Sequence, residues 1–356
     1  MPRVSLAAWG WSESWAEWAA EEGVDPSSVA RVTGQDRSSW SVQTPAGPDR
    51  ARISTKRGIN PTPAVGDWIL LEPGPAPGDP GSIFAVLPRR TLISRGAAGT
   101  GGGSQVLAAN VDRVWIVHGL DMPVSARRLE RYLAVVWDGG ATPEVILTKS
   151  DLADDLEAAI ADVQATAIGA NVRYVSVENP NSVRELRESL VAGSTVSLLG
   201  PSGVGKSTLI NLLAGEDLAA TGEVRAGDRK GRHTTVRREL FRIPGGALLL
   251  DTPGMRELRI GMAEEGLGEV FADIEEVARA CRFRDCRHEG EPGCAVLEAV
   301  EMGVLDSARL SSFRKLRAEA AHEARKADPF ARAAALSDWK TAMKTLKHHP
   351  KYRGRS

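Results

Sequence analysis

The 356-residue sequence has few cysteines, almost no net charge and no long apolar run. Three cysteines are too few for a disulfide framework. Lys+Arg number 45 against 46 Asp+Glu, so the net charge of −1 excludes a polybasic protein. With 42% hydrophobic and 26% charged residues, the chain is neither wholly disordered nor collagen-like. No run of about 18 apolar residues and no signal-peptide pattern occurs, so we expect a cytoplasmic protein outside any membrane.

The first part of the chain suggests a helical extension followed by a small barrel. Leu6, Trp9, Trp15 and Trp18 recur at roughly helical spacing, so residues 1–28 are expected to form a helical extension that packs on a neighbour. An aromatic surface for nucleic acid is the less favoured alternative. Residues 29–95 hold five short β-rich runs between Gly/Pro-rich turns, which predicts a β-barrel, possibly an OB-fold. The glycine-dense residues 96–108 are interpreted as a linker. The alternative, a phosphate-binding loop, lacks a following Gly-Lys-Ser/Thr.

From residue 109 the pattern changes to alternating strands and helices. Apolar runs at 111–119, 144–148, 172–177 and 195–199 are separated by helical periods, and further strands are expected near 238–243 and 247–251. This predicts a doubly wound nucleotide-binding domain over residues 109–262. Residues 263–356 are expected to form a helical domain with a cysteine-rich region and a basic C-terminal tail.

A phosphate-binding loop is the clearest motif. The sequence G-x-x-x-x-G-K-[ST] follows an apolar strand and opens a helix, which is the context that this motif requires. The motif and the next residue are Gly200, Pro201, Ser202, Gly203, Val204, Gly205, Lys206, Ser207 and Thr208. Glycines let backbone N–H groups approach phosphate oxygens. Lys206 is expected on the β- and γ-phosphates and Ser207 on Mg²⁺.

Two further segments carry candidate switch residues. Asp251 ends an apolar strand and can hold Mg²⁺, and Gly254 can turn its N–H toward the γ-phosphate. Thr234 or Thr235, in an aperiodic basic loop, can bind Mg²⁺, and the sequence does not decide between them. The alternative for this loop is a solvated basic segment.

A base-binding motif precedes the phosphate loop in the chain. Thr148, Lys149, Ser150 and Asp151 follow a strand and resemble the [NT]-K-x-D motif of GTPases. The carboxylate of Asp151 can accept from N1–H and the exocyclic amine of guanine, a donor pair that adenine lacks. Ser176 and Val177, at the next strand end, are expected to contact the base. The order of motifs is that of a circularly permuted GTPase, with the Asp251 switch leading directly into the next domain.

The group that activates water is not evident. Met255 stands where Ras-like enzymes carry glutamine, and methionine cannot orient water. We therefore predict slow intrinsic hydrolysis that a partner stimulates. His233 is a candidate replacement, although a solvent-facing loop histidine is an equal alternative.

The three cysteines cluster in one short segment. Cys281, Cys286, His288 and Cys294 form a Cys₃His set, which is typical of a closed structural zinc site. The alternative is three buried thiols beside an uninvolved histidine. Gly290 and Gly293 allow the tight turns that zinc ligation needs.

Together these motifs resemble one family, the bacterial small-subunit-dependent GTPase A, also called RsgA or YjeQ. The resemblance rests on the motifs above and on residues 63–68, 87–91, 105–112 and 128–133, and it covers about residues 30–320. It implies an N-terminal OB-fold, a circularly permuted GTPase domain and a C-terminal zinc domain. It also implies GTP hydrolysis (acid-anhydride hydrolase chemistry) in late maturation of the small ribosomal subunit, binding of 16S rRNA and stimulation by the subunit. A monomer is expected. Thr148 replaces the commoner asparagine, which we expect to weaken a loop-tethering contact slightly.

Two other functions compete with this one. A P-loop ATPase or kinase is disfavoured by Asp151, and a binding module with a vestigial nucleotide site is disfavoured by Lys206, Ser207 and Asp251. Charge distribution favours RNA, because residues 309–356 hold 13 Lys/Arg and 4 Asp/Glu. That segment carries +9 and the remainder −10, so a local basic surface exists despite near-neutrality. A solvated helical face is the alternative for this tail.

Overall fold

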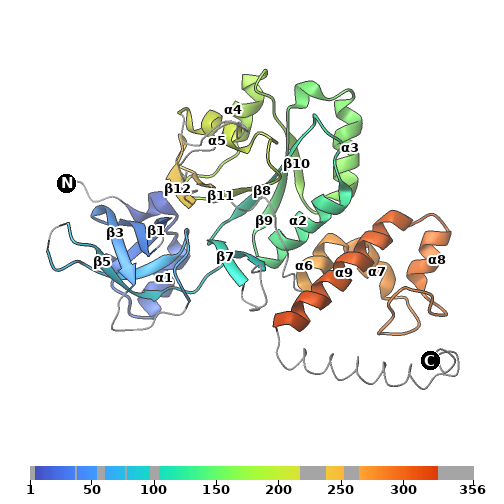
Figure 1. Ribbon diagram of the computed structural model, residues 1–356, viewed down its shortest axis with the longest axis horizontal. Coiled ribbons are helices and arrows are strands. Elements are labelled where there is room, and N and C mark those ends of the chain that lie inside the picture. Colours follow the sequence, from blue (N-terminus) through green and yellow to red (C-terminus); the bar gives the residue numbers. More distant parts are fainter. Residues whose placement is uncertain are drawn as a thin grey trace, which may run out of the picture. The chain divides into compact units, whose positions relative to one another are not determined.

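The computed structural model describes residues 5–36, 38–53, 61–76, 78–96, 104–216, 238–251 and 264–327. The chain divides into two compact units. The first comprises Met1–Ser94 and Val106–Leu258, and the second comprises Arg95–Gln105 and Arg259–Ser356. Figure 1 shows the helices and strands of both units.

The first unit begins with the five-stranded barrel that the sequence predicted. Its strands are β1 (Val29–Asp36), β2 (Ser39–Thr44), β3 (Gly47–Ile53), β4 (Trp68–Glu72) and β5 (Gly81–Val86). They pair in the order β1-β2-β3-β5-β4, and β4 pairs again with β1 to close the barrel. Trp40, Trp68 and Ile83, on β2, β4 and β5, are buried. The expected barrel of the OB type is confirmed.

The N-terminal segment packs on this barrel. It forms a 3₁₀ helix, η1 (Leu6–Trp9), and helix α1 (Glu13–Glu21), and its tryptophans join a cluster with Trp68. The expected packing role is therefore confirmed. The helical extension is not one continuous helix, because Gly10 between η1 and α1 has a positive φ of 89°, and a Cβ there would lie 2.8 Å from the Gly193 carbonyl oxygen.

Part of the expected linker is a strand. β6 (Leu92–Gly96) pairs with β7 (Ser104–Ala109) in a two-stranded sheet. Residues 104–108 are therefore regular structure, and glycine density alone did not distinguish a hairpin from a linker. Residues 97–103 lie outside the described ranges.

The central α/β layer follows, with parallel strands in the order β10-β9-β8-β11-β13. The strands are β8 (Arg113–Gly119), β9 (Thr142–Thr148), β10 (Asn171–Tyr174), β11 (Thr195–Leu199) and β13 (Leu248–Asp251). Helices α4 (Pro180–Glu188) and α5 (Lys206–Ala214) cover one face. Helices α2 (Ala126–Asp138) and α3 (Leu156–Thr166) lie on the other side of the strands in Figure 1. Side chains alternate accordingly: Trp115 and Val117 belong to the core under α4 and α5.

An antiparallel strand connects this layer to the barrel. β12 (Arg238–Arg242) pairs with β13 on one side and with β1 of the barrel on the other. The register places Gly34 opposite Glu239 and Gln35 opposite Arg238. The barrel and the α/β layer therefore share one hydrogen-bonded sheet of 11 strands.

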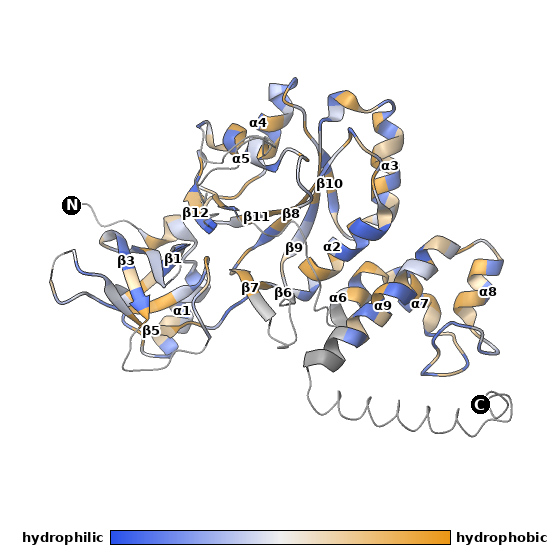
Figure 2. Cartoon of the chain, in the orientation of Figure 1, coloured by the Kyte–Doolittle hydropathy of each residue, from blue (hydrophilic) through white to orange (hydrophobic). Residues whose placement is uncertain are grey.

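The second unit is helical in its C-terminal part. It contains α6 (Glu264–Val270), α7 (Ala272–Ala278), α8 (Ala295–Glu301) and α9 (Ser307–Ala327). Arg309 on α9 donates from Nε and Nη2 to the carboxylate of Asp273 at 2.6 and 2.9 Å, and Phe313 contacts the ring of Phe271 edge-on. The helices carry both apolar and polar residues (Figure 2), as expected where one face is buried. No described helix combines the length and the apolar character that crossing a bilayer requires.

Candidate nucleotide and metal sites

The phosphate loop connects β11 to α5, as predicted. Gly200, Gly203 and Gly205 all have positive φ values, of 154°, 81° and 92°. A Cβ at Gly200 would lie 2.3 Å from the Val117 carbonyl oxygen, so only glycine fits there. Pro201, Ser202 and Thr208 are at least partly exposed, whereas Val204 is buried and anchors the loop to the core. The loop therefore has the glycine-dependent backbone that its motif predicts.

Lys206 folds back over this loop. Its ammonium donates to the carbonyl oxygens of Gly200 at 2.8 Å and Pro201 at 2.5 Å. Ser207, one residue further along α5, is half-buried. The cation therefore sits at the mouth of the loop, where it can move to an incoming phosphate.

The base motif lies at the same edge of the sheet. Asp151 follows β9 and is exposed, and the buried Ser176 follows β10. The Ser176 hydroxyl donates to Oδ1 of Asp151 and accepts from the Glu178 amide at 3.0 Å. This orients the carboxylate while leaving its remaining lone pairs for a pair of N–H donors. Val177 is exposed beside it, so the predicted base residues converge.

Thr148 connects the two loops. Its hydroxyl oxygen lies 2.6 Å from the Val204 carbonyl oxygen in the phosphate loop and 3.2 Å from that of His118. The side chain is buried. A threonine therefore makes the contact between the base motif and the phosphate loop. The slight weakening expected relative to asparagine stays a prediction.

Lys149 is held by a partner that sequence reasoning missed. Its ammonium forms an ion pair with Asp121 at 2.6 Å, and its backbone is left-handed with φ 56°. Asp121 lies just beyond β8, between the two motif-bearing strands. The Lys149 ammonium lowers the pKa of the Asp121 carboxyl through this hydrogen bond. The sequence signal that could have indicated this partner is the position of Asp121, an acidic residue just after a central strand.

Only some of the predicted switch residues lie within the described part of the chain. Asp251 ends β13, whose Leu250 is in register with Ser197 of β11, so it lies at the edge that carries the phosphate loop. The other predicted switch positions, His233, Thr234, Thr235, Gly254 and Met255, lie outside the described residues.

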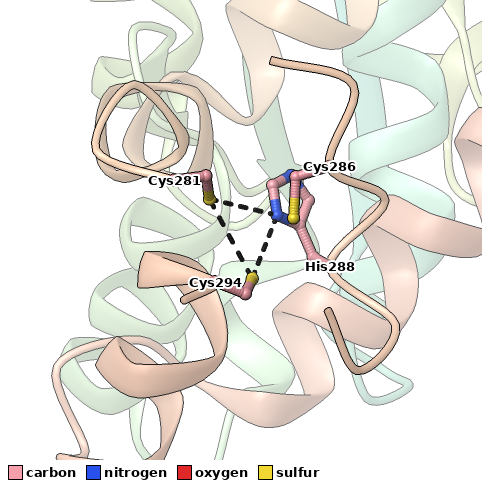
Figure 3. A group of neighbouring side chains, drawn as sticks. All are labelled: Cys281, Cys286, His288 and Cys294. Carbon is pink, nitrogen blue, oxygen red and sulfur yellow. Dashed lines mark hydrogen bonds between the residues drawn. The ribbon is translucent and has the colours of Figure 1, made fainter. Parts of the chain in front are cut away.

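The predicted metal ligands converge in the second unit. The side chains of Cys281, Cys286, His288 and Cys294 point toward one centre (Figure 3), and their ligand atoms all lie within 4.8 Å of one another. Sγ of Cys281 is 4.0 Å from Sγ of Cys294, and Nδ1 of His288 is 3.4 Å from that sulfur. A tetrahedral ion with Zn–S bonds of about 2.3 Å separates its sulfurs by about 3.8 Å. The four residues therefore fit a metal ion of this size.

The protonation states around this centre have clear causes. Burial lowers the pKa of His288, assisted by the nearby Arg317 cation, so the imidazole is held in its neutral, metal-binding form. Burial, with the neighbouring Cys294 and Cys281 thiols, raises the pKa of Cys286 to about 11. A bound divalent cation favours the thiolate instead.

A carboxylate secures the loop between the ligands. Glu291 accepts from the amides of Arg287 and Glu289 at 2.8 Å each, and from that of Gly290 at 3.1 Å. These backbone N–H groups lower the pKa of Glu291 to about 2. Sequence reasoning did not assign Glu291 a role, because a glutamate near a metal motif carries no distinct pattern.

Comparison with known proteins identifies the family. A model of the RsgA GTPase matches residues 86–261. The chain is 39% identical to the small ribosomal subunit biogenesis GTPase RsgA of Methanosarcina acetivorans over 328 residues, which cover 92% of this chain and 89% of that protein. It is 42% identical to the Streptomyces coelicolor protein of the same name over 344 residues, or 94% of this chain and 92% of that one. The chain belongs to the RsgA GTPase family.

Solved structures agree with this assignment. YloQ, described as a circularly permuted GTPase, aligns with a TM-score of 0.57 at 25% identity and covers 83% of this chain and 95% of its own. YjeQ from Thermotoga maritima shares the fold, with a TM-score of 0.59 at 24% identity over 82% of this chain and 98% of its own. The predicted family, GTPase activity and three-part fold are confirmed.

Proposed function

We propose that this protein hydrolyses GTP during late maturation of the small ribosomal subunit, to which it binds through 16S rRNA. The observation that carries this is the hydrogen bond from Thr148 to Val204, because it joins a guanine-selective loop to the phosphate loop. Proteins named for small ribosomal subunit biogenesis match more than nine-tenths of this chain. Asp151 disfavours the alternative of a P-loop ATPase.

Mg²⁺ fits the residues at the phosphate loop. Ser207 and Asp251 come from adjacent elements at one edge of the sheet and supply the oxygen ligands that Mg²⁺ prefers. When bound, Mg²⁺ neutralises charge that develops on the phosphates. Thr234 or Thr235 is proposed as the further ligand, Gly254 as the γ-phosphate contact, and Lys206 as the side chain that orients the β- and γ-phosphates.

The proposed partner compensates for a weak catalytic apparatus. Met255 cannot orient water, so intrinsic turnover is expected near ~10⁻⁴ s⁻¹, and a stimulating partner can raise such rates by about 10⁵-fold. His233 is proposed as the group that positions water once the subunit is bound.

The second unit offers a surface suited to RNA around the Cys₃His set. We assign Zn²⁺ to the Cys₃His set on ligand type and number. Arg282, Arg284 and Arg287 are exposed around it, and the Arg282 guanidinium lies over the exposed ring of Phe283. Arginines with an exposed aromatic ring can contact phosphates and stack on unpaired bases.

A cytoplasmic monomer is proposed. Its parts are an N-terminal extension (1–28), barrel (29–95), GTPase domain (109–262) and zinc domain with basic tail (263–356).

The decisive experiment measures GTP turnover with and without purified small subunits. We expect strong stimulation by small subunits, none by large subunits, and no turnover in Lys206→Ala under either condition. Turnover that small subunits leave unchanged contradicts the proposed partner, whereas ATP competing as well as GTP contradicts the guanine site.

A second experiment tests the RNA surface. Arg284→Ala should weaken subunit binding and reduce the slope of log K against log salt by about 0.7–0.9 if Arg284 contacts one phosphate. Arg184→Ala, an exposed arginine on α4, is the matched control. Equal effects of the two variants contradict a specific RNA-binding surface around the Cys₃His set.

A further inference from the structure

A cavity of about 280 Å³ lies in the first unit, away from the nucleotide loops. Four parts of the unit line it: the N-terminal segment, the barrel region, the segment between β7 and β8, and the start of β11. They contribute Trp11, Ser12, Trp15, Arg31, Arg90, Asp112 and Thr195. Thr195 begins β11, whereas the phosphate loop follows its other end at Leu199. Five strand residues span about 16 Å, so this cavity and the phosphate loop occupy opposite edges of the sheet.

The central feature of the cavity is a buried cation that no carboxylate of the described residues contacts directly. Arg31 is only 2% exposed, and none of the described residues forms an ion pair with it. Nη2 donates to the Asn110 carbonyl oxygen at 3.0 Å and to the Thr195 hydroxyl at 3.2 Å, while Nε has no hydrogen-bond partner among the described residues. The guanidinium also lies 4.8 Å from the ring centre of Trp68, and the Asp112 and Asp67 carboxylates attract it without hydrogen bonding to it. Burial of this cation remains costly, and an anion in the cavity offsets part of that cost.

The charged side chains that line the cavity are two arginines and one aspartate, Arg31, Arg90 and Asp112. Burial lowers the pKa of Arg31 to about 10, and the Asp112 and Asp67 carboxylates oppose this shift, so the guanidinium remains charged at neutral pH. Arg90 adds a second cation, and Asp112 adds one negative charge at the lining. The Asp112 carboxylate accepts from the Thr195 amide at 2.7 Å, which directs one oxygen to the backbone. The lining therefore carries two cations against one anion.

Arg90, the second arginine of the lining, is held at its guanidinium and at its backbone amide. Its guanidinium lies 4.1 Å from the ring centre of Trp15 and donates to the Ser12 hydroxyl at 3.3 Å. Its backbone amide donates to Oδ1 of Asn110 at 2.9 Å, and Nδ2 of Asn110 donates to the Gly66 carbonyl oxygen at 3.1 Å. Arg90 is exposed, and the Trp15 ring and these hydrogen bonds position it at the cavity.

We propose that this cavity binds a small phosphate-class oxyanion, inorganic phosphate or a phosphate monoester, between the Arg31 and Arg90 guanidinium groups. Arginine matches the geometry of phosphate oxygens, and Ser12 and Thr195 supply hydroxyl groups beside it. The indoles of Trp11 and Trp15 offer apolar contact to the organic part of an ester. The size lies near the lower end of the range for small-molecule sites, which suits a small ester.

Equilibrium dialysis of the full chain with labelled inorganic phosphate, and separately with ribose 5-phosphate, tests this proposal. The Lys206→Ala variant lacks one predicted phosphate ligand of the nucleotide loop. Phosphate binding in the cavity should persist in this variant. Arg31→Gln and Arg90→Gln in this background should each weaken binding by about tenfold or more, the loss expected for a charge-assisted hydrogen bond.

Two substitutions of one exposed residue, Ala192, keep the test valid if the Arg31→Gln variant fails to fold. Ala192 is exposed and lines the cavity. Ala192→Glu should weaken phosphate binding by about tenfold through charge repulsion, whereas Ala192→Gln, of matched size, should not. Equal affinities of Ala192→Glu and Ala192→Gln overturn the proposal, as does the absence of any binding to the Lys206→Ala protein.

Discussion

The Thr148 side chain donates to the Val204 carbonyl oxygen at 2.6 Å and so connects the base loop to the phosphate loop. These residues lie 56 positions apart and reach each other because β9 and β11 both flank β8. One buried side chain thus links the predicted base motif to the phosphate loop.

Replacing Thr148 with valine should weaken nucleotide binding. Valine keeps the shape but leaves the buried Val204 carbonyl without its donor, a loss of about 1–3 kcal/mol. We expect GDP and GTP affinities to fall by about fivefold to a hundredfold, measured by titration with a fluorescent nucleotide. Thr148→Ser keeps the hydroxyl and serves as the control. If the valine variant binds as tightly as the serine variant, the tether has no energetic role.

Replacing Asp151 with asparagine should remove the preference for guanine. The amide presents a donor where guanine also presents donors, whereas the carboxylate accepts from both. We expect GTP affinity to fall by about tenfold or more, since charge-assisted hydrogen bonds are lost. Xanthine carries an oxygen in place of the exocyclic amine, so XTP affinity should rise. Asp154→Asn, at a neighbouring exposed acid, should change neither affinity.

The sequence predicted those parts of the site that depend on short segments. The phosphate loop, the Thr148–Asp151 motif and the Cys₃His set each place their residues within one turn or loop, so spacing alone indicates the chemistry. The pairing of β12 with β1 is different, because it joins residues about 200 positions apart. Edge strands expose similar backbone groups, and local pattern does not specify which edges meet.

Two other features depended on context that sequence patterns do not carry. Residues 104–108 looked like linker because glycine-rich hairpin tips and flexible linkers share a composition. Arg31 lies within the correctly predicted strand β1, yet its burial arises only when β11 and the N-terminal segment pack around it. An arginine in a strand is ordinarily solvent-facing, so no one-dimensional pattern indicated a charged cavity.

Removing the proposed Zn²⁺ should unfold the segment around the Cys₃His set. Structural zinc sites can supply on the order of 10–16 kcal/mol, so His288→Ala or chelation should abolish hydrogen-exchange protection across residues 281–294. Zinc content measured by atomic absorption should fall to background. His322→Ala, at an exposed histidine of α9, should keep both zinc and protection. Protection that survives in His288→Ala contradicts a structural role for the metal.

Glu291 should make the stability of the zinc loop depend on pH in the acid range. Its folded pKa is about 2 because three backbone amides donate to the carboxylate, whereas an unfolded glutamate titrates near 4.3. A lowered folded pKa means that the stabilisation is complete above about 4.3 and is lost as pH falls toward 2. The stability difference between wild type and Glu291→Gln should therefore be largest near neutrality and shrink in this window, as measured by denaturant unfolding. Glu289→Gln is the matched control, because its side chain is exposed. A difference that stays constant down to pH 2 contradicts the assigned role of the Glu291 carboxylate.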